Sequence, residues 1–171
     1  MKNGLHIYIR LWNLLGSTLN YFKIVHFRLL GITIGKNCRI YSGVRISGNV
    51  SIGEDGQITI GNDVLIGSLS HIISGHASVE IADHCIFAPS DYISDGTHDI
   101  QAPNALTKHT AVLSERVMIG KNVWLGVEVS VLKGVTIGEG AVVGAKSLVN
   151  KSIPSDCIAA GIPAAVIRKR K

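Results

Sequence analysis

The side chains best suited to proton-transfer chemistry gather in one stretch, residues 94 to 116, which reads S-D-G-T-H-D-I-Q-A-P-N-A-L-T-K-H-T-A-V-L-S-E-R. Its acidic residues and histidines are Asp95, His98, Asp99, His109 and Glu115. Histidine and carboxylate groups are common general acids and bases in enzymes, and long loops on rigid scaffolds usually carry function. The competing interpretation is a solvent-exposed loop without a chemical role. The residue types therefore indicate a candidate site without defining its reaction.

The elements that must position this stretch are marked by a repeat. From Ile119 onward an aliphatic residue returns every six positions, at Ile119, Leu125, Val131, Ile137, Val143 and Val149. A small or β-branched residue stands four places after most of them, at Val123, Val129, Val135, Ala141 and Ser147. A period of six is neither the period of a helix nor the alternation of a single strand. It is the mark of a repeat architecture.

Each six-residue unit, or hexad, predicts one short strand followed by a turn. The aliphatic residue points inward, and the glycine that often follows it allows the backbone to turn without a Cβ clash. Three hexads close one triangular coil, and successive coils stack through parallel ladders. A buried helix is disfavoured because each interior glycine costs about 1 kcal/mol relative to alanine.

A first array of hexads runs from Ile34 to Ile93, with slips at residues 54–57 and 74–79 that we interpret as bulges or small corner loops. The predicted fold is therefore an all-β solenoid, a parallel β-helix over residues 32–168. Residues 94–116 form a long excursion loop between its two arrays. Residues 1–31 are predicted to be a helical segment, and residues 169–171 a basic tail.

Composition agrees with one domain whose core is made of small aliphatic residues, since 46% of the 171 residues are hydrophobic but only 3 are Phe. The net charge is +5, and five of the 17 basic residues lie in the last 21 positions. This balance suits a solvated tail, an acidic membrane, nucleic acid or a polyanionic cofactor. The sequence lacks the pattern of basic residues interleaved with aromatic residues that is typical of nucleic-acid binding. We therefore do not expect nucleic acid as a partner.

The three cysteines, Cys38, Cys85 and Cys157, lack metal-ligand spacing and are predicted to be buried free thiols in a reducing compartment. The N-terminus lacks the pattern of a secretory signal, and no apolar run is long enough for a transmembrane helix. We therefore expect a cytoplasmic location.

The N-terminal segment differs in composition from the rest. It holds five of the nine aromatic residues, and no acidic residue precedes Glu54. Helical spacing joins Leu5, Tyr8, Ile9, Trp12, Leu15, Leu19 and Phe22, which predicts one or two amphipathic helices. Two interpretations stay open. The helix packs across the open end of the coil stack, or it lies on a membrane surface, which its basic and aromatic residues would suit.

Four motifs of the sequence are characteristic in combination: I-A-D-H-C-I-F-A-P-S at 81–90, I-S-D-G-T-H at 93–98, I-G-K-N-V-W-L-G at 119–126, and A-A-G-I-P-A-A-V-I at 159–167. Through them the sequence resembles the hexapeptide-repeat acyltransferases, in particular the galactoside and maltose O-acetyltransferases and the O-acetyltransferases of bacterial surface-polysaccharide clusters. The resemblance covers about residues 32 to 168. It implies a left-handed β-helix, a handedness that counting residues would not reveal because parallel crossovers are otherwise right-handed.

The resemblance also implies acetyl transfer from acetyl-CoA to a hydroxyl of a sugar or glycan, with His98 as the general base. Histidine suits this role because it exchanges protons near neutral pH. Asp95 is the favoured orienting partner of His98, with Asp99 or a backbone carbonyl as alternatives. The galactoside enzymes carry an Asn in an earlier hexad, which the matching stretch I-G-S-L-S-H at 66–71 lacks. This departure favours a polysaccharide or glycan-precursor acceptor over a simple galactoside.

In this family CoA lies in a groove between neighbouring subunits. The residues that match this role are Trp124, Gly126, Gly144, Ala145, Lys146, Pro163, Arg168 and Lys169. The basic tail would then contact the phosphates of CoA. The resemblance implies a homotrimer, with His98 facing the CoA site of a neighbouring subunit.

The sequence leaves three alternatives open. One is N-acetylation of an amino sugar on the same scaffold, and another is a non-catalytic hexapeptide-repeat scaffold. The third is a zinc site of the kind found in a related carbonic anhydrase. That site would use His71, His76 and His98, but the order of these residues does not match, so no metal is expected.

Overall fold

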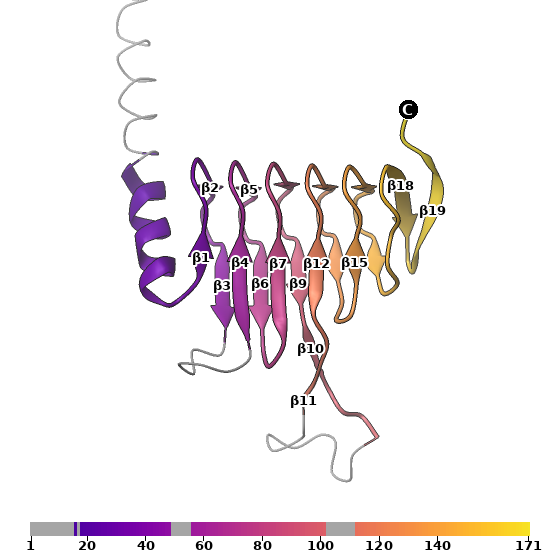
Figure 1. Cartoon of the computed structure of the whole chain (residues 1–171), viewed down its shortest axis with the longest axis horizontal. Coiled ribbons are helices and arrows are strands. Elements are labelled where there is room, and N and C mark those ends of the chain that lie inside the picture. The colour runs from indigo at the N-terminus through magenta and orange to yellow at the C-terminus, as the bar shows by residue number, and fades with distance from the viewer. Residues whose placement is uncertain (1–15, 17, 49–55, 102–111) are drawn as a thin grey trace, which may run out of the picture.

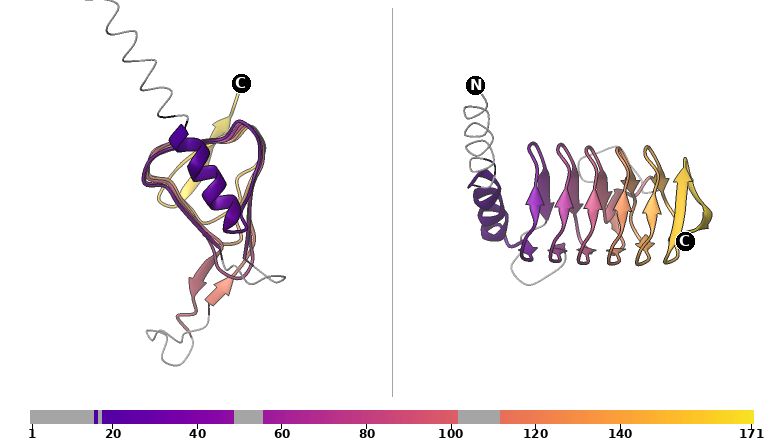
Figure 2. Two further views of the ribbon diagram at one scale, coloured as in Figure 1. Left: turned by 90° about the vertical axis from the view of Figure 1, so that its left-hand side faces the viewer. Right: turned by 90° about the horizontal axis from the view of Figure 1, so that it is seen from above.

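The structure, a computed structural model, describes residues 16, 18–48, 56–101 and 112–171. Its strands form three mainly parallel sheets, the three faces of a triangular prism, and a separate two-stranded antiparallel sheet (Figure 2). The predicted all-β solenoid of stacked coils is confirmed. Of the predicted features, residues 1–15, the first slip as far as residue 55, and residues 102–111 with His109 lie outside the described part of the chain.

Each of the first five coils contributes one strand to each face, and two further strands lie at the C-terminal end of face 2 (Figure 1). Face 1 contains β1 (Thr33–Ile34), β4 (Gln57–Ile60), β7 (Ser78–Ile81), β12 (Val117–Ile119) and β15 (Thr136–Ile137). Face 2 contains β2 (Arg39–Ile40), β5 (Leu65–Ile66), β8 (Ile86–Phe87), β13 (Trp124–Leu125), β16 (Val142–Val143), β18 (Cys157–Gly161) and β19 (Ala164–Lys169). Face 3 contains β3 (Arg45–Gly48), β6 (His71–Ser74), β9 (Tyr92–Ser94), β14 (Ser130–Val131) and β17 (Leu148–Val149).

The aliphatic residues of the hexads form continuous columns inside the prism. Along face 1, pairing in register aligns Ile34, Ile60, Ile81, Ile119 and Ile137. Along face 2 it aligns Ile40, Ile66, Phe87, Leu125, Val143 and Ala159. All of these side chains are buried, as are the small-residue positions Val123, Val129, Val135, Ala141 and Ser147. A single coil could not bury these faces, so stacking is what stabilises the fold.

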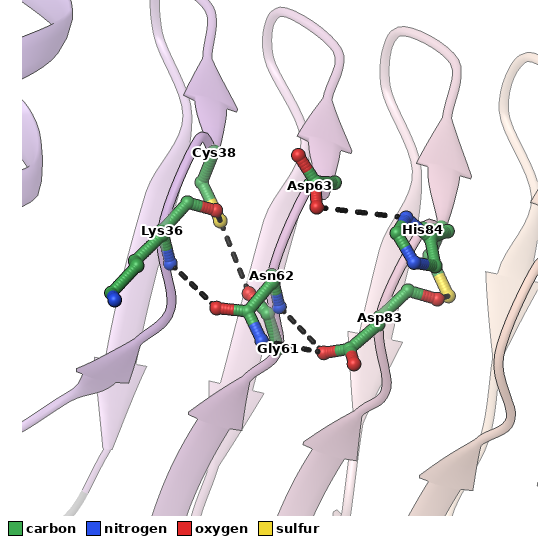
Figure 3. A network of polar contacts seen from close by, with 8 residues as sticks. Lys36, Cys38, Gly61, Asn62, Asp63, Asp83 and His84 are labelled. Carbon is green, nitrogen blue, oxygen red and sulfur yellow. Dashed lines mark hydrogen bonds and ion pairs between the residues drawn. The ribbon is translucent and has the colours of Figure 1, made fainter.

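The corners between faces are held by side chains that follow one another up the stack. Figure 3 shows the first corner, between faces 1 and 2. There Asn62 Oδ1 accepts the Lys36 N–H (2.9 Å), and Asp83 Oδ1 accepts the Asn62 N–H (2.7 Å). This backbone hydrogen bond is the main cause of a lowered pKa at Asp83. Gly61 has no room for a side chain, because a Cβ would lie 2.4 Å from Asp83 Oδ1. The corner is therefore a polar ladder that sets the close spacing of the coils.

The second slip, at residues 74–79, is a short turn between β6 and β7 at the third corner, between faces 3 and 1.

At the C-terminal end, β18 closes the stack and β19 folds back on it as an antiparallel strand. The expected boundary between the β-helix and the basic tail, at residues 168 and 169, thus falls within β19. All three cysteines are buried and free, as predicted.

A helix over residues 18–29 crosses the N-terminal end of the stack (Figure 2). It ends at Gly31, which has a φ of +83°, and the Ile32 N–H donates back to the Phe27 carbonyl (3.1 Å). Phe27 is buried against the first coil, and Ile24 packs there with it. The described part of the predicted apolar stripe faces the other way, since Leu19 and Phe22 are exposed. None of the described helical residues forms a segment with the length and hydropathy needed to cross a bilayer.

Polar side chains on the inner face of this helix satisfy the backbone of the first coil. Asn20 Nδ2 donates to the Cys38 carbonyl (2.9 Å), and Asn20 Oδ1 accepts the Ile40 N–H (2.7 Å). The Arg28 guanidinium donates to the carbonyls of Ile34 (2.6 Å) and Gly35 (3.1 Å). An open β-helix end would otherwise leave a row of unpaired backbone groups. The helix therefore acts as a cap made of hydrogen bonds as well as apolar contacts.

We expect Asn20→Ala to lower the free energy of unfolding by about 1–3 kcal/mol, because it leaves a partly buried donor and acceptor of the first coil without partners. Urea unfolding followed by circular dichroism would measure the change. Leu19→Ala, one residue away on the outer face, is the matched control and should change stability by about 0.5 kcal/mol or less. Equal stability of Asn20→Ala and wild type would contradict the capping role.

Candidate functional site

The stretch that interrupts the hexads begins and ends as a two-stranded antiparallel ribbon. Strand β10 (Gly96–His98) pairs with β11 (Val112–Ser114), and His98 lies opposite Val112. The ribbon projects from the third corner, away from the prism (Figure 1). His98 is the last residue of β10, and its side chain is exposed. The site histidine is thus held on regular backbone, which orders it more than an irregular loop would.

Asp95 anchors the root of the ribbon. Its side chain is fully buried, and its Oδ2 accepts hydrogen bonds from Ser74 Oγ (2.7 Å) and the Ala77 N–H (3.0 Å). Its Oδ1 accepts the Gly75 N–H (2.7 Å). The carboxylate therefore faces the turn between β6 and β7. Among the hydrogen bonds of the described residues, none joins Asp95 to His98.

The other charged residues around the ribbon, Asp99, Glu115 and Arg116, form hydrogen bonds or ion pairs with neighbouring residues. Asp99 Oδ1 accepts the Gln101 N–H (2.9 Å), which closes a short turn beyond His98. Glu115 forms an ion pair with Lys133, and Arg116 forms one with Glu80, so both pairs tie the base of β11 to neighbouring coils. These contacts brace the ribbon against the prism and leave the imidazole of His98 at its exposed end.

The residues expected to bind CoA lie on face 2 and at its ends. Trp124 lies on β13, in the middle of this group, and is 52% exposed. Gly126, Gly144, Ala145 and Lys146 follow at the second corner, between faces 2 and 3. There the coils approach closely, because a Cβ on Gly126 would lie 2.6 Å from the Ala145 nitrogen. Exposed backbone at such a corner can accept an extended, thin ligand.

The C-terminal residues of the expected set are divided between the two ends of face 2. Pro163 lies in the turn between β18 and β19, and the Gly161 N–H of this turn donates to Ser147 Oγ (3.1 Å) at the second corner. Arg168 and Lys169 pair with Ile158 and Cys157 at the other end of β18. The structure thus brings Pro163 to the glycine corner and places Arg168 and Lys169 across the face from it.

An open hollow of about 480 Å³ lies on face 2 beside Trp124. Its lining includes His84 and Asn122 at the first corner, together with Glu139, Asp156 and Arg170. Arg170 overhangs it, since its Nη1 donates to the Gly140 carbonyl (3.0 Å). The sequence motifs pointed to Arg168 and Lys169 but not to Arg170. Its position beside the hollow depends on β19 folding back along the prism.

The two halves of the expected site do not meet within one chain. The ribbon with His98 leaves the corner between faces 3 and 1, whereas Trp124 and the hollow lie on face 2. In a triangular prism that corner is opposite face 2 (Figure 2). A complete site that uses both halves therefore needs a second copy of the chain.

One buried group was not predicted from the sequence. Asp91 is almost fully buried at the second corner, where its Oδ1 accepts the Val129 N–H (2.8 Å). Its other oxygen, Oδ2, is buried and has no hydrogen-bond partner among the described residues. Burial raises the pKa of Asp91 to about 7. The hexad register contained the signal, because Asp91 occupies the same position as Val129, two residues before the inward Ile93.

The cysteines are buried, and His71 and His76 lie on face 3 and at the third corner. Burial raises the pKa of the Cys85 thiol to about 11 and also raises that of Cys38. His71 lies on β6 of face 3, and His76 lies exposed in the turn that Asp95 holds. Across the ranges that the structure describes, no three His, Cys, Asp or Glu side chains are grouped as a metal site.

The fold and site define a class, the parallel β-helices of hexapeptide repeats with an inserted ribbon that carries a histidine. A family model described as bacterial transferase hexapeptide (six repeats) matches residues 116–151. The putative colanic acid biosynthesis acetyltransferase WcaF of Escherichia coli (strain K12) is 32% identical, over 99% of this chain and 91% of that protein. The putative lipopolysaccharide biosynthesis O-acetyl transferase WbbJ of the same organism is 32% identical, over 87% of this chain and 88% of that protein.

Among solved structures, AntD resembles this fold, with a TM-score of 0.70 and 27% identity over 82% of this chain and 73% of that one. AntD is an N-acyltransferase from Bacillus cereus, in complex with dTDP and 3-hydroxybutyryl-CoA. The chain belongs to the hexapeptide-repeat acetyltransferase family, and its β-helix is left-handed, as the resemblance implied.

Proposed function

We propose that the protein is an acetyl-CoA-dependent O-acetyltransferase that acts on a sugar hydroxyl in the biosynthesis of a surface polysaccharide or related glycan. The observation that carries this proposal is His98, exposed at the end of a braced ribbon on a hexapeptide-repeat β-helix. Residues 32–168 would be the catalytic domain, with residues 1–31 as a helical appendage and 169–171 as a basic tail. We propose a cytoplasmic location, where acetyl-CoA is available.

His98 is the general base in this proposal. Its imidazole takes the proton of the acceptor hydroxyl while the hydroxyl oxygen forms a bond to the thioester carbonyl carbon. The carbon–sulfur bond then breaks, CoA leaves as a thiolate, and the imidazolium returns the proton to that sulfur. A free hydroxyl is too weak an acid to react unaided, and a positioned base supplies about 10²- to 10⁴-fold.

Face 2 is the proposed donor site. Trp124 would pack against the pantetheine arm, and the exposed backbone of Gly126, Gly144 and Ala145 would let that arm pass close to the corner. The phosphates of the donor would be bound by Lys146, Arg168 and Lys169. In the isolated chain the Nζ of Lys146 lies 3.7 Å from Oε2 of Glu128. Pro163 would shape the turn at the glycine corner. An elongated ligand fits this division, because Arg168 and Lys169 lie at one end of the face and the glycine corner with Lys146 lies at the other.

The proposed assembly is a homotrimer with each active site between two subunits. Two observations support it. His98 and face 2 of the same chain lie on opposite sides of the prism. The ribbon also exposes large apolar side chains, namely Ile100, Val112 and Leu113, which a subunit contact would cover.

Asp95 is proposed to position His98 through the backbone, because its carboxylate binds the turn at 74–77. We expect Asp95→Asn to lower kcat about tenfold or more while the KM for acetyl-CoA changes little, since face 2 is untouched. The amide cannot accept all three hydrogen bonds, so the free energy of unfolding should also fall by about 1–3 kcal/mol. Steady-state kinetics at several temperatures would separate the two effects. An unchanged kcat in a folded variant would remove Asp95 from the site.

A second candidate, N-acetylation of an amino sugar, is favoured by one comparison, the N-acyltransferase AntD. The names of WcaF and WbbJ refer to polysaccharide biosynthesis, and that of WbbJ to O-acetyl transfer, which supports the hydroxyl acceptor. The test is thiol release from acetyl-CoA with sugars, amino sugars and cell-surface glycan fractions. Release only with amino sugars would favour the second candidate. No release with any acceptor and no calorimetric binding of acetyl-CoA would favour a non-catalytic scaffold.

A further inference from the structure

The N-terminal helix packs both apolar and polar side chains against the first coil, and it also carries apolar side chains on its outer face. Its inner face carries Asn20, Lys23 and Arg28, which hydrogen-bond to the backbone of the first coil. Its outer face carries apolar side chains. The exposed fraction is 62% for Phe22 and 82% for Leu29, which lie seven residues apart on one side of the helix. A helix normally buries its apolar stripe and exposes its charges. In the part of the chain that the structure describes, no residue covers this outer face.

The exposed large apolar residues at this end of the molecule lie on the helix and in the turn that follows it, and we call them the helix patch: Leu19, Tyr21, Phe22, Leu29 and Leu30. Contiguous exposed apolar surface marks a site of protein or membrane interaction. Isolated exposed residues elsewhere need no such explanation. Here they occur along a single helix, with Tyr21 and Phe22 in edge contact (centroids 6.0 Å apart).

The charges at this end define the chemistry of the partner. The chain contains no Asp or Glu before Glu54, while Lys36, Arg39 and Arg45 are exposed on the first coil, the coil that the helix contacts. Within the described part of the chain, no ion pair involves these three residues. An apolar helix face with unpaired basic residues around it complements an anionic lipid surface, which attracts each nearby Lys or Arg by about 1 kcal/mol.

We propose that the helix patch docks on the surface of an anionic lipid bilayer, with Phe22 and Leu29 entering the interfacial region and the basic residues of the first coil facing lipid headgroups. The helix lies across the end of the prism (Figure 2). Its outer face can therefore contact a flat surface while the three faces of the β-helix remain free. A peripheral association of this kind needs no membrane-spanning segment.

The test is sedimentation of the full-length protein with vesicles of phosphatidylglycerol and phosphatidylethanolamine, compared with pure phosphatidylcholine vesicles. Wild type should bind the anionic vesicles, and high salt should weaken the binding because it screens the basic residues. The double variant Phe22→Gln, Leu29→Gln should reduce the bound fraction about tenfold or more. Both residues are highly exposed, so circular dichroism and thermal unfolding should match wild type.

The matched control is Val166→Gln, Ile167→Gln, which removes two exposed apolar side chains from β19 at the other end of the prism. It should bind vesicles like wild type. The proposal is overturned if wild type does not sediment with anionic vesicles, or if the Phe22 and Leu29 variant binds them undiminished. It is also overturned if light scattering shows self-association that this variant abolishes, without vesicle binding, since the occupant is then a second copy. The readout does not use acetyl transfer, so either result leaves the proposed reaction untouched.

Discussion

Replacement of His98 by alanine should lower kcat for acetyl transfer by about 10²- to 10⁴-fold, the contribution of a positioned general base. His98 is exposed at the end of β10, so its truncation removes no core contact. The free energy of unfolding should therefore change by about 0.5 kcal/mol or less. The KM for acetyl-CoA should also stay near that of wild type, because the proposed donor residues lie on face 2. Initial rates of thiol release, with acceptor saturating, would measure the effect.

His76→Ala is the matched control for this experiment. His76 is another exposed histidine near the third corner, and neither the proposed base nor the donor site includes it. It should retain wild-type activity. If both variants lose activity and a chelator inactivates wild type, the histidines act as a metal site and the general-base role is wrong. If His98→Ala keeps wild-type activity, His98 is not the base.

The same variant tests where the active site lies. A mixture of His98→Ala with Trp124→Ala, unfolded and refolded together, should regain activity although each variant alone is nearly inactive. With random assembly, about one quarter of the interfaces would combine an intact His98 with an intact face 2. Activity that never exceeds the sum of the separate variants would mean that each chain uses its own His98 and its own face 2.

Asp91→Asn should strongly change the pH dependence of stability, because it removes a buried carboxyl group. In wild type, burial raises the pKa of Asp91 from its ordinary value of 3.8 to about 7. Between these two values the folded chain keeps a proton that the unfolded chain has released. The free energy of unfolding therefore falls as pH rises through this window, and the full penalty is present above about pH 7. This difference between the folded and unfolded pKa of Asp91 corresponds to a change of about 4 kcal/mol in the free energy of unfolding.

The measurement is urea unfolding of wild type and Asp91→Asn across this pH range. Because asparagine does not titrate, the stability of the variant relative to wild type should rise by about 4 kcal/mol from the acidic to the basic end. Asp83→Asn, measured with its own wild-type reference below pH 3.8, is the control of opposite sign. Hydrogen bonds lower the pKa of Asp83, so its stabilising contribution is present above the unfolded pKa and is lost as pH falls through the folded pKa. If the difference in free energy of unfolding between wild type and Asp91→Asn does not vary with pH, Asp91 stays ionised in its buried corner.

Much of the fold could be predicted from the hexads because their physical meaning is local. A recurring aliphatic residue such as Ile119 or Val131 must face inward if the chain is to bury it, and the turn at each corner is encoded within a few residues. The same register marks Asp91 as an interior position, although only the structure shows that one of its oxygens lacks a partner. The stretch with His98 stood out equally clearly, because an array that stops for more than a coil and then resumes must leave the prism.

Other features depended on contacts between residues far apart in the chain. The resemblance suggested that Asp95 would orient His98, yet its carboxylate turns inward to Ser74, about twenty residues earlier, because the third corner needs an acceptor for its free N–H groups. Helical periodicity located the N-terminal helix but not its orientation. Phe22 faces outward because the open coil offers unpaired backbone groups, and Asn20 and Arg28 can satisfy them.

The sequence by itself thus determined the class of fold and the inward columns, since both depend on a repeat readable within one coil. The interruption marked residues 94–116 as the candidate site, and the family resemblance singled out His98 within it as the candidate base. Only the tertiary structure decided which groups meet. It placed His98 at a corner opposite face 2, divided the expected CoA residues between two ends of that face, and turned the apolar side of the helix outward. The reason is that the closing of three hexads into a triangle fixes the distances between residues that no spacing along the chain encodes.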